Sequence, residues 1–424
     1  MIEREQAMKP NPLLRSPNDF CWATGIENTF IPHARPGMRP MDEYELTQHY
    51  DQYELDFSLA ARLGVRAIRW GIPWYRVEPE PGRFDWEWTD RALEVMVEKH
   101  RLVPILDLMH YGTPFWLEGS FASPDYPARV AEYAAAVARR YIDRVQVFTP
   151  LNEPIVNADF CGSRGEWPPY LTGDAGFVTV LMAIARGIMQ TVAALRAEQP
   201  GCFLVQVEAL WHFWTANPAY QQQIALRNER QYLCFDLTTG RVDANHMLWP
   251  LLRGHGVTEA DLQWFRENAV TFDIFGANFY PWSYGEMAAE AVSTAVEDVL
   301  PKRIGPPTPG SAIAEVVRDA HSRYGLPVMV TETSANAPEE GRAAWMDETI
   351  SAVMDLRKQG VPVVGYTWFP MMTMIDWDYR TGTKPLADYL LHLGLYDSAF
   401  DENGILQRMP TGLAGQYRRY TQGP

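Results

Sequence analysis

The sequence predicts an α/β fold with a single domain, in which eight parallel strands close into a (β/α)8 TIM barrel. Short apolar runs alternate with longer amphipathic segments over most of the 424 residues. The runs are continuously apolar, as expected of strands that are buried on both faces. Eight such runs occur, which suits one large barrel domain. No GxGxxG motif follows the first run, which argues against a doubly wound sheet.

The expected elements follow one another in a regular order. The strands are expected at residues 20–24, 65–70, 102–108, 145–152, 202–207, 272–278, 328–331 and 362–368. Apolar residues at helical spacing predict helices at 42–61, 88–100, 127–142, 177–197, 311–324 and 342–358. Gly64 and Gly360 end the first and the last of these helices. Thr258 and Asp261 have the spacing of a capping box, which predicts one more helix start.

Domain organisation and location follow from what separates the elements. No long polar linker divides the chain, so residues 1–17 are expected to be a lead-in and residues 18–424 the barrel. The first residues are acidic and polar where a signal peptide would be basic and then apolar. No run of about 18 apolar residues occurs. We therefore expect a soluble, cytoplasmic protein with no membrane partner, and a homo-oligomer stays open.

Composition excludes several classes of partner. A formal charge of −16 and a pI near 5.1 argue against nucleic-acid binding, which needs a basic surface. The four cysteines are widely spaced without a CxxC pair, which predicts buried thiols and neither a zinc site nor a disulfide framework. No metal and no cofactor are predicted. The 15 Trp and 20 Tyr exceed what a core needs, and aromatic faces stack on sugar rings.

Polar residues gather where the expected strands end. In a barrel of parallel strands the chemistry lies at these carboxyl ends. The residues there are Arg69, His110, Asn152, Glu153, Glu208, Asn278, Tyr280, Glu332 and Trp368. Glu153 closes the fourth strand and Glu332 the seventh, so they would face each other across the barrel mouth. Paired carboxylates hydrolyse glycosides with retention at about 5–5.5 Å and with inversion at about 6.5–9.5 Å, and sequence leaves this separation open.

The motifs around these glutamates resemble those of family 1 glycoside hydrolases. Residues 149–154, TPLNEP, resemble the T-x-N-E-P acid/base motif with one additional residue, and residues 330–333, VTET, resemble the (I/V)-T-E-N-G nucleophile motif. Further matches extend from Phe20 to Asp397. They are FCWAT at 20–24, HYDQY at 49–53, IRWGIPWYR at 68–76, HYGTP at 110–114, NFY at 278–280 and GLYD at 394–397.

The resemblance implies a role for each matching residue. Glu332 would be the nucleophile, and Glu153 the acid that later acts as base. Asn152 would bind the sugar 2-hydroxyl, and Arg69 and Tyr280 would keep Glu332 ionised and oriented. The other implied substrate-binding positions are His110 at the 3-hydroxyl, Asn278, and Trp368 as a platform beneath the sugar.

Four further substrate-binding positions depart from the family. Asn28 would stand for a glutamine that follows the first strand, and Tyr111 for a tryptophan after the third. Asp376 and Trp377, with one residue inserted, would stand for the Glu-Trp pair that holds the 4- and 6-hydroxyls. These positions recognise the sugar, so the family pattern predicts the catalysis more firmly than the identity of the glycone.

The predicted function is that of a retaining β-glycosidase acting on small β-glycosides. It would be β-glucosidase-like, with β-galactosides and β-fucosides as other candidate substrates. A non-catalytic sugar-binding barrel and a transglycosidase are the alternatives, and a 6-phospho-β-glycosidase is a third because Arg380 and Lys384 follow the Asp376–Trp377 pair. A metal site built from His110, Glu208, His212 and Asp273 is disfavoured, since no local ligand spacing supports it.

Overall fold

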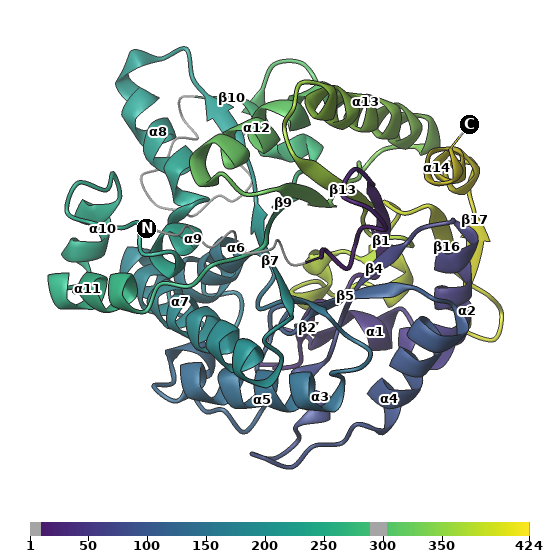
Figure 1. Ribbon diagram of the computed structural model, residues 1–424, viewed down its shortest axis with the longest axis horizontal. Helices are drawn as coiled ribbons and strands as arrows, with labels where there is room; N and C mark the ends of the chain where they lie inside the picture. The colour runs from purple at the N-terminus through teal and green to yellow at the C-terminus, as the bar shows by residue number, and fades with distance from the viewer. Residues whose placement is uncertain (1–9, 289–302, 424) are drawn as a thin grey trace, which may run out of the picture.

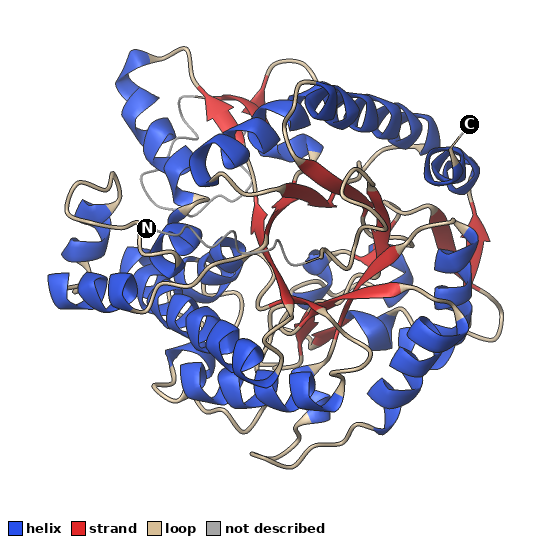
Figure 2. Ribbon diagram, in the orientation of Figure 1, coloured by secondary structure: helices blue, strands red, loops and turns tan. Residues whose placement is uncertain are grey.

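Eight parallel strands close into a barrel in the computed structural model, which describes residues 10–288 and 303–423 (Figures 1 and 2). Every neighbouring pair of barrel strands is parallel. In order around the barrel they are β1 (Cys21–Gly25), β4 (Ala67–Gly71), β5 (Val103–Asp107), β6 (Val147–Thr149), β7 (Phe203–Ala209), β9 (Ile274–Asn278), β12 (Val328–Glu332) and β13 (Val363–Trp368). Each falls on one of the eight apolar runs, so the predicted fold class is confirmed.

Helices surround this ring on the outside (Figure 2). The larger ones are α2 (His49–Arg62), α5 (Tyr126–Arg140), α7 (Gly173–Glu198), α12 (Ile313–Tyr324) and α13 (Glu339–Lys358). The smaller ones are α3 (Trp74–Val77), α6 (Pro154–Ala158), α8 (Gln221–Arg230), α9 (Leu233–Thr238), α10 (Trp249–Gly254), α11 (Glu259–Glu267) and α14 (Gly412–Gln422). The capping box predicted at Thr258 opens α11 and is present in full.

Two of the predicted helices are interrupted. The helix expected at 42–61 is divided into α1 (Glu43–Leu46) and α2, with Gln48 between them at a φ of 60°. A left-handed residue cannot continue a right-handed helix, so the chain restarts. The helix expected at 88–100 begins as α4 (Glu87–Leu93) and continues with π-helical hydrogen bonding over Glu94–Lys99.

The end of the barrel at which the strands begin, called the lower end below, is closed by the chain that leads into β1. Leu13 is fully buried in an apolar cluster with the early residues of the strands, among them Cys21, Ala67 and Ile105. Arg66 Nε donates to the Leu13 carbonyl at 2.8 Å, which fixes this segment against the start of β4. The four cysteines are free and buried, as predicted.

One helix in the described residues, α7, is long and apolar enough to cross a membrane by length and composition. In this protein 61% of its apolar window is buried, and the helix packs along α5 on the barrel wall. We therefore interpret α7 as a core helix of the outer layer.

Short strands outside the barrel form separate small sheets. A small sheet contains β8 (His212–Trp214), β10 (Tyr284–Met287) and β11 (Arg303–Ile304). The GLYD motif runs into β16 (Tyr396–Phe400), which pairs with β17 (Leu406–Pro410) in a hairpin rather than with a barrel strand. The remaining pairs are β2 (Phe30–Ile31) with β3 (Met41–Asp42), and β14 (Met374–Ile375) with β15 (Leu390–Leu391).

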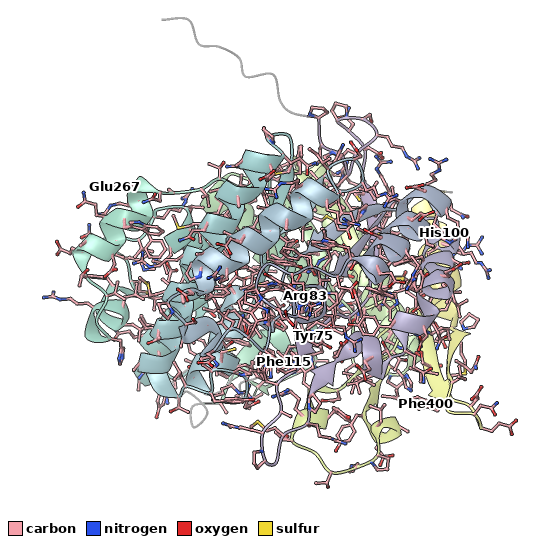
Figure 3. The ribbon with its side chains drawn as sticks, turned by 90° about the horizontal axis from the view of Figure 1, so that it is seen from below. Tyr75, Arg83, His100, Phe115, Glu267 and Phe400 are labelled. Atoms are coloured by element: carbon pink, nitrogen blue, oxygen red, sulfur yellow. The ribbon has the colours of Figure 1, made fainter. Side chains whose placement is uncertain are left out.

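The loops that follow neighbouring strands meet at one end of the barrel. Tyr75, just after β4, and Phe115, after β5, lie side by side with ring centroids 5.7 Å apart (Figure 3). Because all eight strands are parallel, the polar residues that follow them converge on this same end.

Candidate active site

Glu153 is held at the junction between β6 and α6. It is the N-cap residue of α6, with Pro154 at the first helical position and a φ of 42°. A left-handed conformation is uncommon for a residue other than glycine and costs about 1–3 kcal/mol. The Glu153 backbone N–H donates to the Val207 carbonyl of β7 at 3.1 Å, which ties this turn to the neighbouring strand. The backbone thus fixes the position from which the Glu153 side chain extends.

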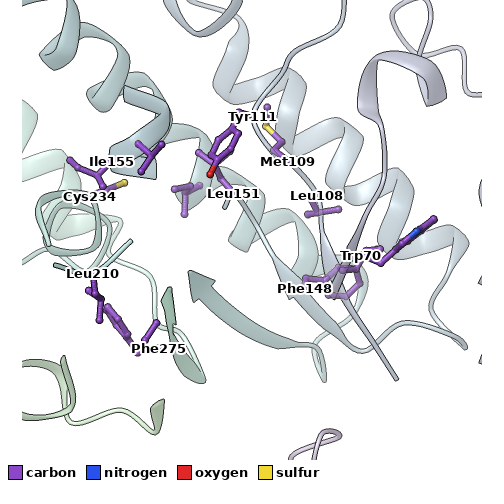
Figure 4. Close-up of a cluster of buried hydrophobic side chains, with 14 of the residues drawn as sticks. Trp70, Leu108, Met109, Tyr111, Phe148, Leu151, Ile155, Leu210, Cys234 and Phe275 are labelled. Atoms are coloured by element: carbon purple, nitrogen blue, oxygen red, sulfur yellow. The ribbon is translucent and has the colours of Figure 1, made fainter. Parts of the chain in front are cut away.

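Both carboxylate oxygens of Glu153 accept a hydrogen bond. Tyr111 OH donates to Oε2 at 2.5 Å, and Asn278 Nδ2 donates to Oε1 at 2.8 Å. The Tyr111 ring is buried in the same apolar cluster as Leu151 and Ile155 (Figure 4), so the hydroxyl has little freedom to turn away. Glu153 itself is 7% exposed.

Glu332, the last residue of β12, is held from two other strands. Arg69 Nη1 of β4 donates to Oε1 at 2.5 Å, and Tyr280 OH, just after β9, donates to Oε2 at 2.7 Å. Arg69 is fully buried and Glu332 is 4% exposed. The guanidinium therefore neutralises the carboxylate in a site with little water, where charge interactions are strong.

Electrostatics set the protonation of Glu332. Burial raises the pKa of Glu332 most, the Arg69 guanidinium lowers it, and the nearby Glu153 raises it again, to a final pKa of about 7. A carboxyl so shifted exchanges its proton near neutral pH rather than near pH 4.

Asn152 connects the two glutamates. Its Oδ1 accepts from Arg69 Nη2 at 3.0 Å and from Asn278 Nδ2 at 3.3 Å. Its Nδ2 donates to Tyr111 OH at 2.8 Å and lies 3.0 Å from His110 Nε2. Hydrogen bonds thus run from Glu332 through Arg69, Asn152 and Asn278 to Glu153, so the two carboxylates belong to one rigid constellation.

Asp107, at the end of β5, contacts two residues of this constellation, Arg69 and His110. Its Oδ2 accepts from Arg69 Nη2 at 2.7 Å and lies 3.4 Å from His110 Nδ1. Burial lowers the pKa of His110, but the carboxylates of Asp107, Glu27 and Glu332 outweigh burial, so the His110 pKa lies above its usual value. The sequence-based site did not include Asp107, although a single acidic residue within the apolar run 102–108 was a signal.

Asn28 and Trp368 are fully buried, as are Arg69 and Asn152. Asn28 has no exposed surface, and a Cβ on Gly71 would lie 1.8 Å from its Nδ2, so only glycine fits beneath it. Trp368 also has no exposed surface, and its Nε1 donates to the Leu393 carbonyl at 3.1 Å. Their predicted contacts with substrate stay predictions.

Asp376 and Trp377 lie at the start of a 3-10 turn, Trp377–Arg380. The Asp376 carboxylate caps this turn by accepting from the Asp378 backbone N–H at 2.9 Å. The Trp377 ring packs against three aromatic rings that include Tyr111, at centroid distances of 5.1–5.8 Å. Trp377 thus lies beside the residue that contacts Glu153.

The disfavoured metal set is not gathered in the structure. His212 lies 3.3 Å from Glu315 on the small outer sheet, and His110 contacts Asp107 and Asn152 instead. In the described part of the chain the groups that could hold an ion are His212, Glu315 and Asp319, and Glu229, Asp236 and His246. In the second group, Glu229 and Asp236 are already paired with Arg323. Glu208 is fully buried, and burial and then Glu153 raise its pKa.

Comparison with known proteins finds similarity to glycoside hydrolases. A model of glycosyl hydrolase family 1 matches residues 41–204, the part of the chain that contains Arg69, His110, Asn152 and Glu153. A bifunctional β-D-glucosidase/β-D-fucosidase of Bifidobacterium breve is 25% identical over 78% of this chain and 80% of the relative. The thermostable β-glucosidase B of Thermobispora bispora is 27% identical over 78% of this chain and 74% of the relative. These matches are consistent with a divergent relative of glycoside hydrolase family 1.

The barrel also matches a solved structure over nearly its whole length. A β-glucosidase from Thermotoga maritima in complex with deoxynojirimycin superposes with a TM-score of 0.81, at 19% identity, over 96% of this chain and 98% of that one. The likeness confirms the fold. Together with the family match, the relatives show that the protein is a β-glycosidase that acts on glycosides.

The expected pH dependence of the activity follows from the Glu332 pKa. If Glu332 must be ionised to react, kcat/KM falls as the pH drops through about 7, because the carboxylate then takes up a proton. Measuring kcat/KM for an aryl β-glycoside between pH 4 and pH 9 checks this, with the chain shown to stay folded by circular dichroism. An acidic limb centred near pH 4 would contradict the assignment.

Proposed function

We propose that this protein is a retaining β-glycosidase that removes a terminal sugar from small β-glycosides, with Glu332 as nucleophile and Glu153 as acid and base. The observation that carries the proposal is the hydrogen-bonded set that holds both carboxylates at one end of the barrel. Retaining chemistry needs two carboxyl groups that act from opposite sides of the scissile bond.

The first step forms a glycosyl-enzyme. A Glu332 carboxylate oxygen attacks the anomeric carbon while the glycosidic C–O bond breaks, and the Glu153 proton goes to the leaving oxygen. Arg69 and Tyr280 hold Glu332 in position for this attack. The second step reverses the roles, because Glu153 is now a carboxylate. It accepts a proton from water, the water oxygen bonds to the anomeric carbon, and the ester bond to Glu332 breaks.

The residues around the pair would orient the sugar. Asn152 Nδ2 and His110 lie within 3.0 Å of each other, so a sugar hydroxyl that approaches one meets both. Asn152 would bind the 2-hydroxyl and His110 the 3-hydroxyl, as the family resemblance implies. Hydrogen bonds to the 2-hydroxyl that strengthen in the transition state contribute several kcal/mol in such enzymes.

In our proposal, Tyr111 acts on catalysis through its hydrogen bond to Glu153. Its hydroxyl accepts from Asn152 and donates to Glu153, so it stabilises the carboxylate form that the second step needs. We expect Tyr111→Phe to lower kcat for a dinitrophenyl β-glycoside, whose second step limits the rate, about 10- to 100-fold, the effect of one hydrogen bond to a charged group. Tyr126→Phe is a matched control, because among the described residues its buried hydroxyl makes one hydrogen bond, to the Met109 sulfur at 3.5 Å, and it should keep nearly full activity. Equal activity of the two variants would exclude this role.

The glycone is the least determined part of the proposal. The relatives act on β-glucosides and, in one case, on β-fucosides, which supports a β-glucosidase-like enzyme. A panel of 4-nitrophenyl β-glycosides (gluco, galacto, fuco, xylo, manno and 6-phosphogluco) tests the proposal. Release of nitrophenol from at least one of them, with a first product of retained configuration, is expected. No release from any of them, or an inverted first product, would overturn it.

The remaining sequence-based statements stay predictions. We propose that residues 18–424 work as one catalytic barrel, supported by the way Leu13 of the lead-in closes its lower end. A cytoplasmic location stays a prediction, and the oligomeric state stays open.

A further inference from the structure

Glu27, a residue that the sequence-based site did not include, lies at the same end of the barrel as the catalytic pair. It follows β1 by two residues and is 7% exposed. Its Oε1 accepts from the Thr29 backbone N–H at 3.0 Å and from Thr29 Oγ1 at 2.7 Å. The same oxygen lies 3.7 Å from His110 Nε2. Within the described ranges, Oε2 accepts no hydrogen bond, so this oxygen is available to a ligand.

Glu27 also acts electrostatically on the catalytic groups. Besides burial, its charge contributes to raising the pKa of Glu332, of Tyr280 and of Tyr111, which come from the ends of β12, β9 and β5. The Glu27 carboxylate also lies 3.7 Å from His110 Nε2, which in turn lies 3.0 Å from Asn152 Nδ2, so it stands beside the hydrogen-bonded residues of the site. Glu27 is therefore a third carboxylate directed at the space where the sugar would lie.

The charge on this end of the barrel is not balanced. The Arg69 guanidinium forms ion pairs with Glu332 and Asp107, at 2.5 and 2.7 Å. His110 is the one basic side chain within 4.0 Å of Glu27 among the residues described. Nearby Glu43 is fully buried, and burial and then the charge of Glu27 raise its pKa, which favours the neutral form of this carboxyl group. A cationic group on the sugar would fill this deficit, and an anionic group would increase it.

We propose that Glu27 determines glycone specificity by binding the sugar beside His110 through Oε2, and that it selects a glycone with a protonated amine there over a neutral or an anionic one. This inference rests on the proposed function, because it needs the sugar to lie between Glu27 and the catalytic pair. The carboxylate offers only acceptor oxygens, and its hydrogen bonds with a cationic donor are stronger than those with a neutral one. The sequence position of the neighbouring Asn28 suggested a sugar-binding role, but its side chain is fully buried and packs against Gly71.

Glu27→Gln tests the inference, because it keeps the size and one acceptor oxygen and removes the charge. The substrates are 4-nitrophenyl β-glucoside and its 3-amino-3-deoxy counterpart, since His110 is expected to contact the 3-position. At pH 7 the wild-type enzyme should have the higher kcat/KM for the amino sugar. The variant should lose that preference about 10- to 100-fold, the range for a hydrogen bond between charged groups. An unchanged ratio in an active variant would overturn the inference.

Two further measurements separate the possible failures. Glu259→Gln, on the outer helix α11, is the matched control and should leave the ratio unchanged. If the Glu27 variant does not fold, the wild-type enzyme still decides, because equal kcat/KM for the 3-amino-glucoside and the neutral β-glucoside would overturn the inference. If the wild-type enzyme and the Glu259 variant hydrolyse no aryl β-glycoside, the proposed function fails instead.

Discussion

Replacing Glu332 by glycine is expected to lower kcat by about 10⁴-fold or more, the scale for removing one member of a catalytic unit. The variant retains the barrel and Glu153 but has no group to form the covalent intermediate. Added azide should restore turnover, because the missing side chain leaves room for a small anion at the face of the sugar that Glu332 attacks. The product should be the α-glycosyl azide, inverted at the anomeric carbon.

The control for this experiment is Glu340→Gln on the exposed start of α13, which should be as active as the wild-type enzyme. Product configuration is measured by proton NMR of the anomeric signal. Full turnover without azide, or a β-glycosyl azide from the Glu332 variant, would remove Glu332 from the role of nucleophile.

Replacing Glu153 by alanine is expected to slow hydrolysis about 10²- to 10⁴-fold, the range for losing a general acid and base. The loss should depend on the leaving group. A dinitrophenolate leaves without a proton, so formation of the glycosyl-enzyme should stay fast and its hydrolysis should limit the rate. An alkyl leaving group needs the Glu153 proton, so those substrates should lose far more.

Azide gives the Glu153 variant a product that distinguishes it from the Glu332 variant. The anion attacks the glycosyl-enzyme from the side where Glu153 would activate water, so a β-glycosyl azide of retained configuration is expected. A rate loss of the same size for dinitrophenyl and alkyl glycosides would show that Glu153 does not protonate the leaving group.

The barrel could be predicted from the sequence because strands buried on both faces are continuously apolar. All eight runs, from 20–24 to 362–368, form barrel strands. The additions to the barrel were harder to predict. The β16–β17 hairpin carries a motif that resembles a final strand, yet Tyr396 pairs with Pro410. Helix α9 spans only six residues, too few to show a helical period. Gln48 divides a helix through its backbone conformation, which its residue type does not indicate.

The candidate site was predicted where a polar residue ends an apolar strand. Glu153, Glu332, Arg69 and Asn152 are examples, and the structure brings them together through hydrogen bonds. Side-chain direction in the loops could not be predicted. The sequence could not show whether residue 27 or residue 28 faces the site, because the chain has left the regular alternation of β1 at that point.

The measurement that tests the central claim most directly is covalent trapping of the intermediate. The enzyme is incubated with 2,4-dinitrophenyl 2-deoxy-2-fluoro-β-glucoside. The fluorine slows both steps, but the good leaving group lets the first step proceed, so the glycosyl-enzyme accumulates. Mass spectrometry of the digested protein then locates the sugar. We expect one fluoroglucosyl group per chain, attached to Glu332, and no labelling of the Glu332→Gly variant. A sugar attached to another residue, or inactivation without any adduct, would contradict the account.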